Sequence, residues 1–178
     1  MAETLTLRIC AGSLRGRKLT LPLLPGLRPT PSRVRETLFN WLQGWIEGRR
    51  VLDMFAGAGG LSLEALSRGA HSVHAIERDA QLAQHLLNTA AAWKVEGLRV
   101  HRGDALTLAI EPGFDLIFID PPFGKSMLAP ALARAEAVLN PDGMVVIEHE
   151  KGVELPPGWV ELKRTRAGAE HLALLERA

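Results

Sequence analysis

The spacing of hydrophobic positions changes twice along this chain and divides it into three stretches. In residues 5–21, apolar and polar side chains alternate on both sides of a Gly-containing connection, which predicts a β-hairpin. From Val34 to Trp45 the apolar residues recur at helical spacing, so residues 31–46 are expected to form an amphipathic helix. Thr30 is the expected N-cap of this helix, with Pro31 at its first position.

From residue 50 onward, apolar runs alternate with amphipathic stretches. This alternation predicts a parallel sheet with helices on both of its faces. A turn at 166–168 joins the last two runs, which predicts an antiparallel hairpin. The expected strands are 50–54, 72–77, 98–102, 114–119, 144–149, 158–164 and 169–176, and the expected helices are about 59–68, 79–93 and 126–139.

The fold class that follows is α/β: a doubly wound, Rossmann-like, mostly parallel seven-stranded sheet that ends in an antiparallel hairpin. An N-terminal β-hairpin and helix precede it. We therefore divide the chain into a basic N-terminal appendage, residues 1–48, and a main domain, residues 49–178.

Composition narrows the class of protein. The 178 residues are 47% hydrophobic and 23% charged, which is typical of one soluble globular domain. No apolar run approaches the roughly 20 residues of a membrane span, and the N-terminus lacks the pattern of a signal peptide. The single cysteine, Cys10, fits a reducing cytoplasm, and neither Cys nor His shows ligand spacing. We expect a cytoplasmic monomer that uses no metal and no membrane.

Charge is distributed unevenly along the chain. Residues 1–50 contain nine Lys or Arg against three Glu, whereas residues 51–178 contain 12 basic and 17 acidic residues. A basic arm on an acidic body suggests a polyanionic partner. Charge alone is equally compatible with a solvated basic surface that binds nothing, because Lys and Arg commonly protect exposed strand edges.

A glycine-rich loop follows the first strand of the main domain. Phe55-Ala56-Gly57-Ala58-Gly59-Gly60 leads into a helix, where glycines let the backbone approach a ligand closely. Ser62 replaces the third glycine of the dinucleotide-binding pattern, so the motif is partial. Asp53 would repel a pyrophosphate at this place. Its carboxylate instead favours the ammonium and sulfonium of S-adenosylmethionine.

Two more acids end the next two strands. Glu77, twenty positions after Gly57, can accept hydrogen bonds from both ribose hydroxyls of that cofactor. Asp104 can accept the adenine amino hydrogens, and Ala105 can offer its backbone N–H. Each acid alone could be a helix N-cap or a turn residue. Three acids at the carboxyl ends of consecutive strands together indicate a cofactor site.

The fourth strand ends in Asp120-Pro121-Pro122-Phe123. This motif places a carboxylate, a free backbone carbonyl, a turn stiffened by two prolines and an aromatic ring at one sheet edge. The Asp120 carboxylate and the Pro121 carbonyl could accept both hydrogens of a planar amino group, while Phe123 stacks on its base. A proline-capped turn with Asp120 as helix N-cap is the alternative interpretation.

Taken together, these motifs resemble those of the bacterial 16S rRNA guanine-N2 methyltransferases, the RsmD-type family of class I methyltransferases. The resemblance runs nearly end to end. It includes the opening stretches 8–19 and 28–40, the glycine loop 53–59, residues 63–70 and Asp120-Pro121-Pro122-Phe123. Position 10 departs from the family pattern, because Cys10 stands where an aliphatic residue is usual.

The resemblance implies an enzyme that uses S-adenosylmethionine to methylate N2 of a specific guanine in 16S rRNA, within an assembled or partly assembled small subunit. The catalytic residues it implies are Asp120, Pro121 and Phe123. The implied cofactor residues are Thr30, Arg33, Asp53, Phe55, Ala56, Gly57, Gly59, Glu77, Arg78, Asp104, Ala105 and Asp120. The implied RNA-binding residues are Arg8, Arg15, Arg17, Lys18, Arg28, Pro122 and Phe123.

Other functions remain open at this point. The same chemistry would serve an amino methyltransferase acting on another RNA or on DNA adenine. A binding factor for ribosome assembly could keep the fold without turnover. A nicotinamide oxidoreductase is disfavoured by Asp53 and by the absence of tyrosine from the chain.

Overall fold

A computed structural model gives the fold and describes residues 4–122 and 126–178, without the side chain of Ala167. A two-stranded antiparallel hairpin comes first and a seven-stranded sheet follows, with strand order β5-β4-β3-β6-β7-β9-β8. The strands are β1 Leu5–Arg8, β2 Lys18–Leu21, β3 Arg50–Asp53, β4 Ser72–Glu77, β5 Leu98–Arg102, β6 Phe114–Ile119, β7 Leu139–Glu150, β8 Trp159–Ala167 and β9 Glu170–Arg177.

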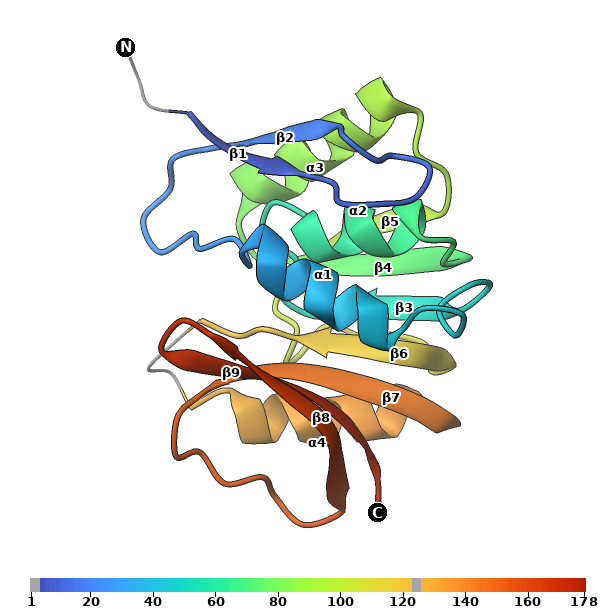
Figure 1. The fold of residues 1–178 in the computed structure, drawn as a ribbon, viewed down its shortest axis with the longest axis vertical. Helices are drawn as coiled ribbons and strands as arrows, with labels where there is room; N and C mark the ends of the chain where they lie inside the picture. The colour runs from blue at the N-terminus through green and yellow to red at the C-terminus, as the bar shows by residue number, and fades with distance from the viewer. Residues whose placement is uncertain (1–3, 123–125) are drawn as a thin grey trace.

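Strands β3 to β7 pair in parallel, whereas β9 pairs antiparallel with both β7 and β8. This arrangement confirms the predicted doubly wound sheet with a C-terminal hairpin. The helices are α1 Ser32–Trp41, α2 Gly60–Ser67, α3 Ala80–Trp93 and α4 Leu128–Val138. Figure 1 shows α1 and α2 in front of the sheet and α4 behind it.

Separate apolar clusters fill the two sides of the sheet. On the α1–α2 side, buried Leu38 and Phe39 pack with Val51 and Phe118, and the two Phe rings meet edge to face at 6.0 Å. On the α4 side, Leu132 packs with residues such as Ile117. Because α1 contributes to the main core, the apolar interior continues across the 48/49 boundary of our sequence-based division.

Most predicted elements agree with the structure to within one or two residues. Strand β7 begins five residues before the predicted 144, because Leu139 already pairs with Phe114 across an irregularity, and β8 ends three residues after the predicted 164, because Ala167 still pairs with Glu170. Helix α1 also differs. Pro31, not Thr30, is its N-cap; no side chain caps it, and its last helical residue is Trp41 rather than residue 46. The predicted Thr30 cap is wrong because the Pro31 carbonyl, in extended backbone, already accepts the N–H of Arg35. The Thr30 carbonyl is occupied by the Arg35 side chain at 3.2 Å.

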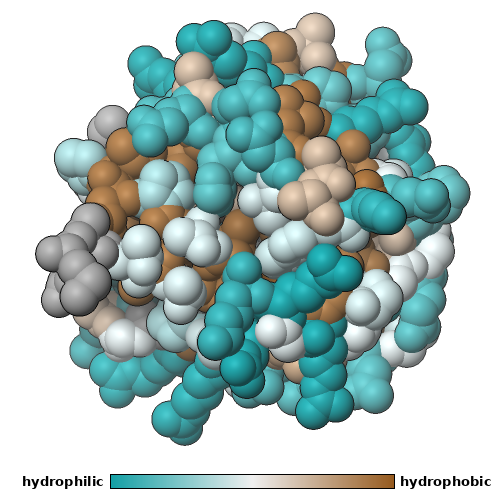
Figure 2. Space-filling view, turned by 90° about the horizontal axis from the view of Figure 1, so that it is seen from above, coloured by the Kyte–Doolittle hydropathy of each residue, from teal (hydrophilic) through white to brown (hydrophobic). Residues whose placement is uncertain are grey.

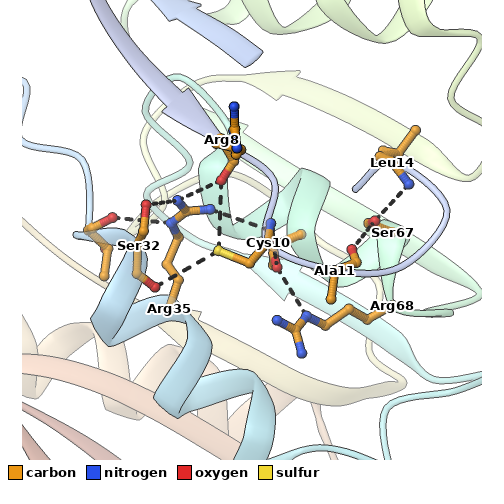
Figure 3. Close-up of polar contacts among 10 residues, drawn as sticks. Arg8, Cys10, Ala11, Leu14, Ser32, Arg35, Ser67 and Arg68 are labelled. Carbon is orange, nitrogen blue, oxygen red and sulfur yellow. Dashed lines mark hydrogen bonds and ion pairs between the residues drawn. The ribbon is translucent and has the colours of Figure 1, made fainter. Parts of the chain in front are cut away.

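A buried ion pair joins the N-terminal hairpin to the main domain (Figure 3). Glu64 of α2 is completely buried; its carboxylate lies 3.3 Å from the Arg35 guanidinium and 3.0 Å from that of Arg68. It also accepts the backbone N–H of Cys10 at 3.0 Å. Arg35 in turn donates to the Arg8 carbonyl at 2.9 Å. The segment after β1, the start of α1 and the middle of α2 therefore share one polar cluster.

A second contact holds the loop between β1 and β2 against the end of α2. The Ser67 hydroxyl accepts the N–H of Leu14 at 2.9 Å and donates to the Ala11 carbonyl at 2.5 Å. A Cβ at Gly12, whose φ is +87°, would lie 1.8 Å from the Ser67 carbonyl oxygen. Only glycine fits this close approach.

Figure 2 views the molecule from the side of β1, β2 and α3, and hydrophilic side chains cover most of this face, with hydrophobic areas between them. Among the helices of the described chain, none is long and apolar enough to cross a membrane.

Candidate active site

A cavity of about 1000 Å³ opens at the carboxyl ends of β3, β4, β5 and β6. Parallel strands bring their carboxyl ends to one sheet edge, which is where ligands bind in open α/β sheets. Most of the predicted cofactor residues line this cavity. They are Thr30, Asp53, Phe55, Ala56, Gly57, Glu77, Arg78, Asp104, Ala105 and Asp120, joined by Arg28, Pro121 and Pro122 from the other predicted groups.

Asp53 forms the floor of the cavity. Its side chain is 1% exposed, and its Oδ2 accepts the Ser62 hydroxyl at 2.7 Å. The buried Oδ1 has no hydrogen-bond partner among the described residues. Burial raises the pKa of Asp53 to about 6, although the Ser62 hydroxyl opposes this rise. A buried carboxylate oxygen without a partner is costly, so this floor suits a ligand that brings a positive charge or a hydrogen-bond donor.

The glycine loop passes close to neighbouring groups. Gly57 and Gly59 both have positive φ, +57° and +94°. A Cβ at Gly59 would lie 2.3 Å from a Leu86 methyl group of α3. Gly59 does not line the cavity itself; it lets the loop turn into α2 while packing on α3. At the third position of the dinucleotide glycine pattern, the Ser62 side chain donates its hydroxyl to the Asp53 carboxylate. A glycine there could not make this hydrogen bond, which explains the departure from the pattern.

Glu77 fixes the loop from the next strand. Its carboxylate accepts the N–H of Gly57 at 2.7 Å and the N–H of Asp79 at 2.9 Å. Burial raises the pKa of Glu77, and the backbone hydrogen bonds oppose this rise. Each oxygen keeps a lone pair that can accept a hydroxyl of a ligand.

Asp104 stabilises a turn and also lines the cavity. Its Oδ1 accepts the N–H of Leu106 at 2.9 Å, so the side chain stabilises the turn after β5. The carboxylate also lines the cavity beside Ala105, which is buried.

Asp120 lies one residue beyond β6, on the cavity wall. Burial raises its pKa to about 7; the Asp53 charge adds to this rise, and a hydrogen bond with Glu148 opposes it. Sequence reasoning missed Glu148, a buried acid on β7. The available signal was an acidic residue inside an otherwise apolar run, two positions after Val146.

The N-terminal segment closes one side of the cavity with apolar residues that the sequence analysis did not single out, beside the predicted Thr30. Leu7, Leu24 and Leu27 line this wall. A Leu27 methyl group lies 3.5 Å from the position of a Cβ on Gly57, and a Leu7 methyl group lies 3.0 Å from that of Gly60. The appendage therefore belongs to the cavity and is not only an external arm.

The remaining predicted residues lie away from the cavity wall. Arg33 is exposed on α1, and Arg8, Arg15 and Lys18 are exposed around the N-terminal hairpin. The Arg17 guanidinium lies 5.7 Å from the centre of the Trp93 ring. Phe123, predicted to stack on a target base, lies outside the described residues.

Exposed cations stand at the rim of a cavity whose floor is acidic. Three exposed cations, Arg28, Arg78 and Lys151, line the cavity together with two exposed acids, Asp79 and Glu150. Asp53 and Asp120 lie deeper. This arrangement suits a ligand that places a cation on the floor and anionic groups at the mouth.

The chain has close relatives among known proteins. The family described as Conserved hypothetical protein 95 matches residues 7–176. The chain is 41% identical to Ribosomal RNA small subunit methyltransferase D of Escherichia coli strain K12 over 154 residues, 84% of this chain and 78% of that protein. Its identity to the protein of the same name from Haemophilus influenzae is 37% over 171 residues, 90% and 89% of the two chains.

Solved structures agree with these matches. The Escherichia coli protein yhhF has a TM-score of 0.87 and 35% identity, covering 97% of this chain and 98% of that one. TrmN from Thermus thermophilus has a TM-score of 0.72 and 29% identity, covering 85% of this chain and 50% of that one.

Proposed function

From the premise that this chain belongs to the RsmD-type family of class I methyltransferases, we propose that it methylates the exocyclic N2 of a guanine in 16S rRNA, with S-adenosylmethionine as methyl donor. The observation that carries the proposal is that the carboxylates Asp53 and Asp120 line the same cavity, the first with a buried oxygen that lacks a partner among the described residues. The relatives named above are small-subunit rRNA methyltransferases; that the target lies in an assembled or partly assembled subunit is part of this proposal.

The cavity residues fit this donor. Asp53 offers an acceptor to an ammonium group or to a water that bridges to it. Glu77 is already held by two backbone N–H groups and can accept ribose hydroxyls. Asp104 and Ala105 offer an acceptor and a backbone donor to an adenine edge. When bound, S-adenosylmethionine supplies a methyl group on a positively charged sulfur, which the acidic floor favours over an anionic cofactor.

The exocyclic amine that accepts the methyl group is a poor nucleophile, and the protein must make it more reactive. The lone pair of an exocyclic amine is delocalised into the base, so the nitrogen is a weak nucleophile. Hydrogen bonds from its two N–H groups to the Asp120 carboxylate and the Pro121 carbonyl would favour tetrahedral geometry and localise that lone pair. Positive charge then develops on nitrogen, and the same two acceptors stabilise it in the transition state. Positioning supplies the rest, because methyl transfer is an in-line displacement.

The distribution of charge supports a polyanionic acceptor. Arg28, Arg78 and Lys151 at the rim can meet phosphates while the base enters the acidic cavity. Exposed Arg8, Arg15 and Lys18 extend the basic surface along the N-terminal hairpin. Most phosphate contacts fix the orientation of a nucleic acid rather than read its sequence, so these residues would position the target loop.

The test is transfer of labelled methyl from S-adenosylmethionine to unmodified small ribosomal subunits, naked 16S rRNA and DNA, followed by identification of the modified nucleoside by mass spectrometry. N2-methylguanosine from subunits or rRNA is the expected product, and the better acceptor shows whether ribosomal proteins help to form the target. N6-methyladenine in DNA would keep the chemistry but overturn the substrate. No transfer to any acceptor would overturn the enzymatic proposal in favour of a binding factor.

A further inference from the structure

Four acidic side chains, none of them exposed, occupy neighbouring positions on one face of the sheet, and exposed Glu150 follows Glu148 on the same face, in register with Glu170. Asp53 pairs in register with Phe118, and Phe118 pairs with Val146. Asp120 and Glu148 each lie two residues further along, so they are opposite one another and on the same face as those apolar residues. Glu170 belongs to the same face of β9, two residues before Leu172, which pairs with Glu148.

Glu148 lies between two of these acids. It is 7% exposed, and the strand register places its carboxyl group beside those of Asp120 and Glu170. A hydrogen bond between two carboxyl groups requires a proton on one of them. Among residues 4–122 and 126–178, no ion pair joins a Lys, Arg or His to Asp53, Asp120, Glu148 or Glu170, so a proton is what relieves the repulsion within this group.

The proton that Glu148 and Asp120 share can reside on either carboxyl group, and their surroundings determine which one keeps it. Burial raises the pKa of Glu148 to about 9, and the Asp120 charge adds to this rise. The pKa of Asp120 rises less, to about 7, because the hydrogen bond with Glu148 opposes the effect of burial. The pair loses its protons in two steps. Glu148 is buried away from the cavity whereas Asp120 lines it, so we assign the retained proton to Glu148 and the charge to Asp120.

We propose that Glu148 is a positioning residue for the methyl-transfer site: its protonated carboxyl donates to Asp120 and holds that carboxylate, ionised, facing the cavity. This inference rests on the proposed function, because Asp120 must be an anion to accept the substrate amine. Glu148 does not line the cavity, and it acts on the acceptor only through Asp120. A buried carboxyl donor among other acids is suited to this task, since it stays protonated where an ordinary glutamate would ionise.

Two substitutions separate this role from packing. Glu148→Gln keeps an N–H donor toward Asp120 but cannot ionise, whereas Glu148→Leu removes the donor at similar volume. Glu148→Leu is expected to lower turnover about 10- to 100-fold, as loss of a hydrogen bond to a charged group does. Glu148→Gln should stay within about threefold of the wild type and lose the decline in turnover at alkaline pH, because only glutamate can ionise there. Affinity for S-adenosylmethionine should stay unchanged in both variants.

A stability measurement tests the shared proton without any turnover. The folded protein keeps protons on Glu148 and Asp120 that the unfolded chain releases near its ordinary carboxyl pKa values. The free energy of unfolding of the wild type should therefore fall as pH rises from about 5 to about 9, and Glu148→Gln should flatten this fall. Glu176→Gln, an exposed glutamate on β9, is the control and should leave the wild-type slope unchanged.

The outcomes separate this inference from the proposed function. If the wild type methylates subunits and Glu148→Leu matches it in rate and pH profile, the positioning role of Glu148 is wrong while the function stands. Equal damage in Glu148→Gln and Glu148→Leu would also overturn it. If the wild type methylates nothing but Glu148→Gln flattens the stability profile, the shared proton is real and the proposed function fails. An identical stability profile in wild type and Glu148→Gln refutes the shared proton.

Discussion

The Glu77 carboxylate accepts the backbone N–H of Gly57 at 2.7 Å, so the end of β4 holds the turn that follows β3. A second hydrogen bond, from the N–H of Asp79, fixes the other oxygen at 2.9 Å. The residue proposed to bind ribose hydroxyls is therefore held in place before any ligand arrives, which lowers the ordering cost of binding.

Glu77→Ala is expected to weaken binding of S-adenosylmethionine about 10- to 100-fold, since it removes acceptors from the ligand and frees the glycine loop. Isothermal titration calorimetry measures the change. Glu96→Ala removes an exposed glutamate in the connection between α3 and β5 and is the control. Equal affinities in the two variants would contradict the proposed ribose contact.

Asp120→Ala should lower turnover about 10²- to 10³-fold, because in the proposed mechanism Asp120 stabilises charge that develops on the acceptor amine. Affinity for S-adenosylmethionine should change little. Single-turnover methylation of small subunits gives the rate, and calorimetry gives the affinity. Asp142→Ala, an exposed aspartate within β7, is the control. Wild-type turnover in Asp120→Ala would refute the proposed mechanism.

Arg35→Met should destabilise the fold by about 1.5–3 kcal/mol, because the buried Glu64 carboxylate loses one of its two guanidinium partners and keeps Arg68. Arg164→Met breaks the exposed ion pair with Glu161 and should cost at most about 1 kcal/mol. Denaturant titration of both variants measures the free energy of unfolding. If both variants lost a similar free energy of unfolding, burial of the Arg35–Glu64 pair would not determine how much the pair stabilises the fold.

The histidine pair on β4 and β5 predicts a loss of stability in acid. His74 Nδ1 lies 3.0 Å from His101 Nε2, and burial, followed by the His101 charge, lowers the pKa of His74 to about 4. The unfolded chain binds that proton near pH 6.5, so the His74 contribution to the free energy of unfolding falls as pH drops from about 6.5 to about 4, opposite in sign to the contribution of the buried carboxyl groups. His74→Gln should reduce this fall, measured by denaturant titration at each pH. Exposed His71→Gln should not; equal slopes would contradict the expectation.

Replacing Arg15 and Lys18 with Ala should weaken RNA binding and reduce the slope of log affinity against log salt by about 1 for each phosphate that the variant no longer binds. Arg17 is left in place because its guanidinium packs over Trp93. Filter binding to 16S rRNA across a salt series measures the slope. Lys94 after α3 and Arg99 on β5 are exposed and provide a control pair of equal charge. If the slope of log affinity against log salt did not change, Arg15 and Lys18 would be part of a solvated strand edge that does not contact RNA.

The order and type of the elements followed from the sequence alone, because periodicity is a local property that burial imposes on each segment. The sequence also located the acids after β3, β4, β5 and β6, since parallel strands must bring their carboxyl ends to one edge. Asp53, Glu77, Asp104 and Asp120 could therefore be assigned to one site before any coordinates were known.

Three relationships emerged only from the folded chain: Glu148 meets Asp120, Leu27 closes the cavity, and Arg35 joins the hairpin to α2. They depend on strand register and on pairs of residues far apart in sequence, such as the 29 positions between Arg35 and Glu64. Local patterns cannot specify such pairs. A buried charge is favourable only where the fold supplies its partner, and that partner is set by how the elements pack.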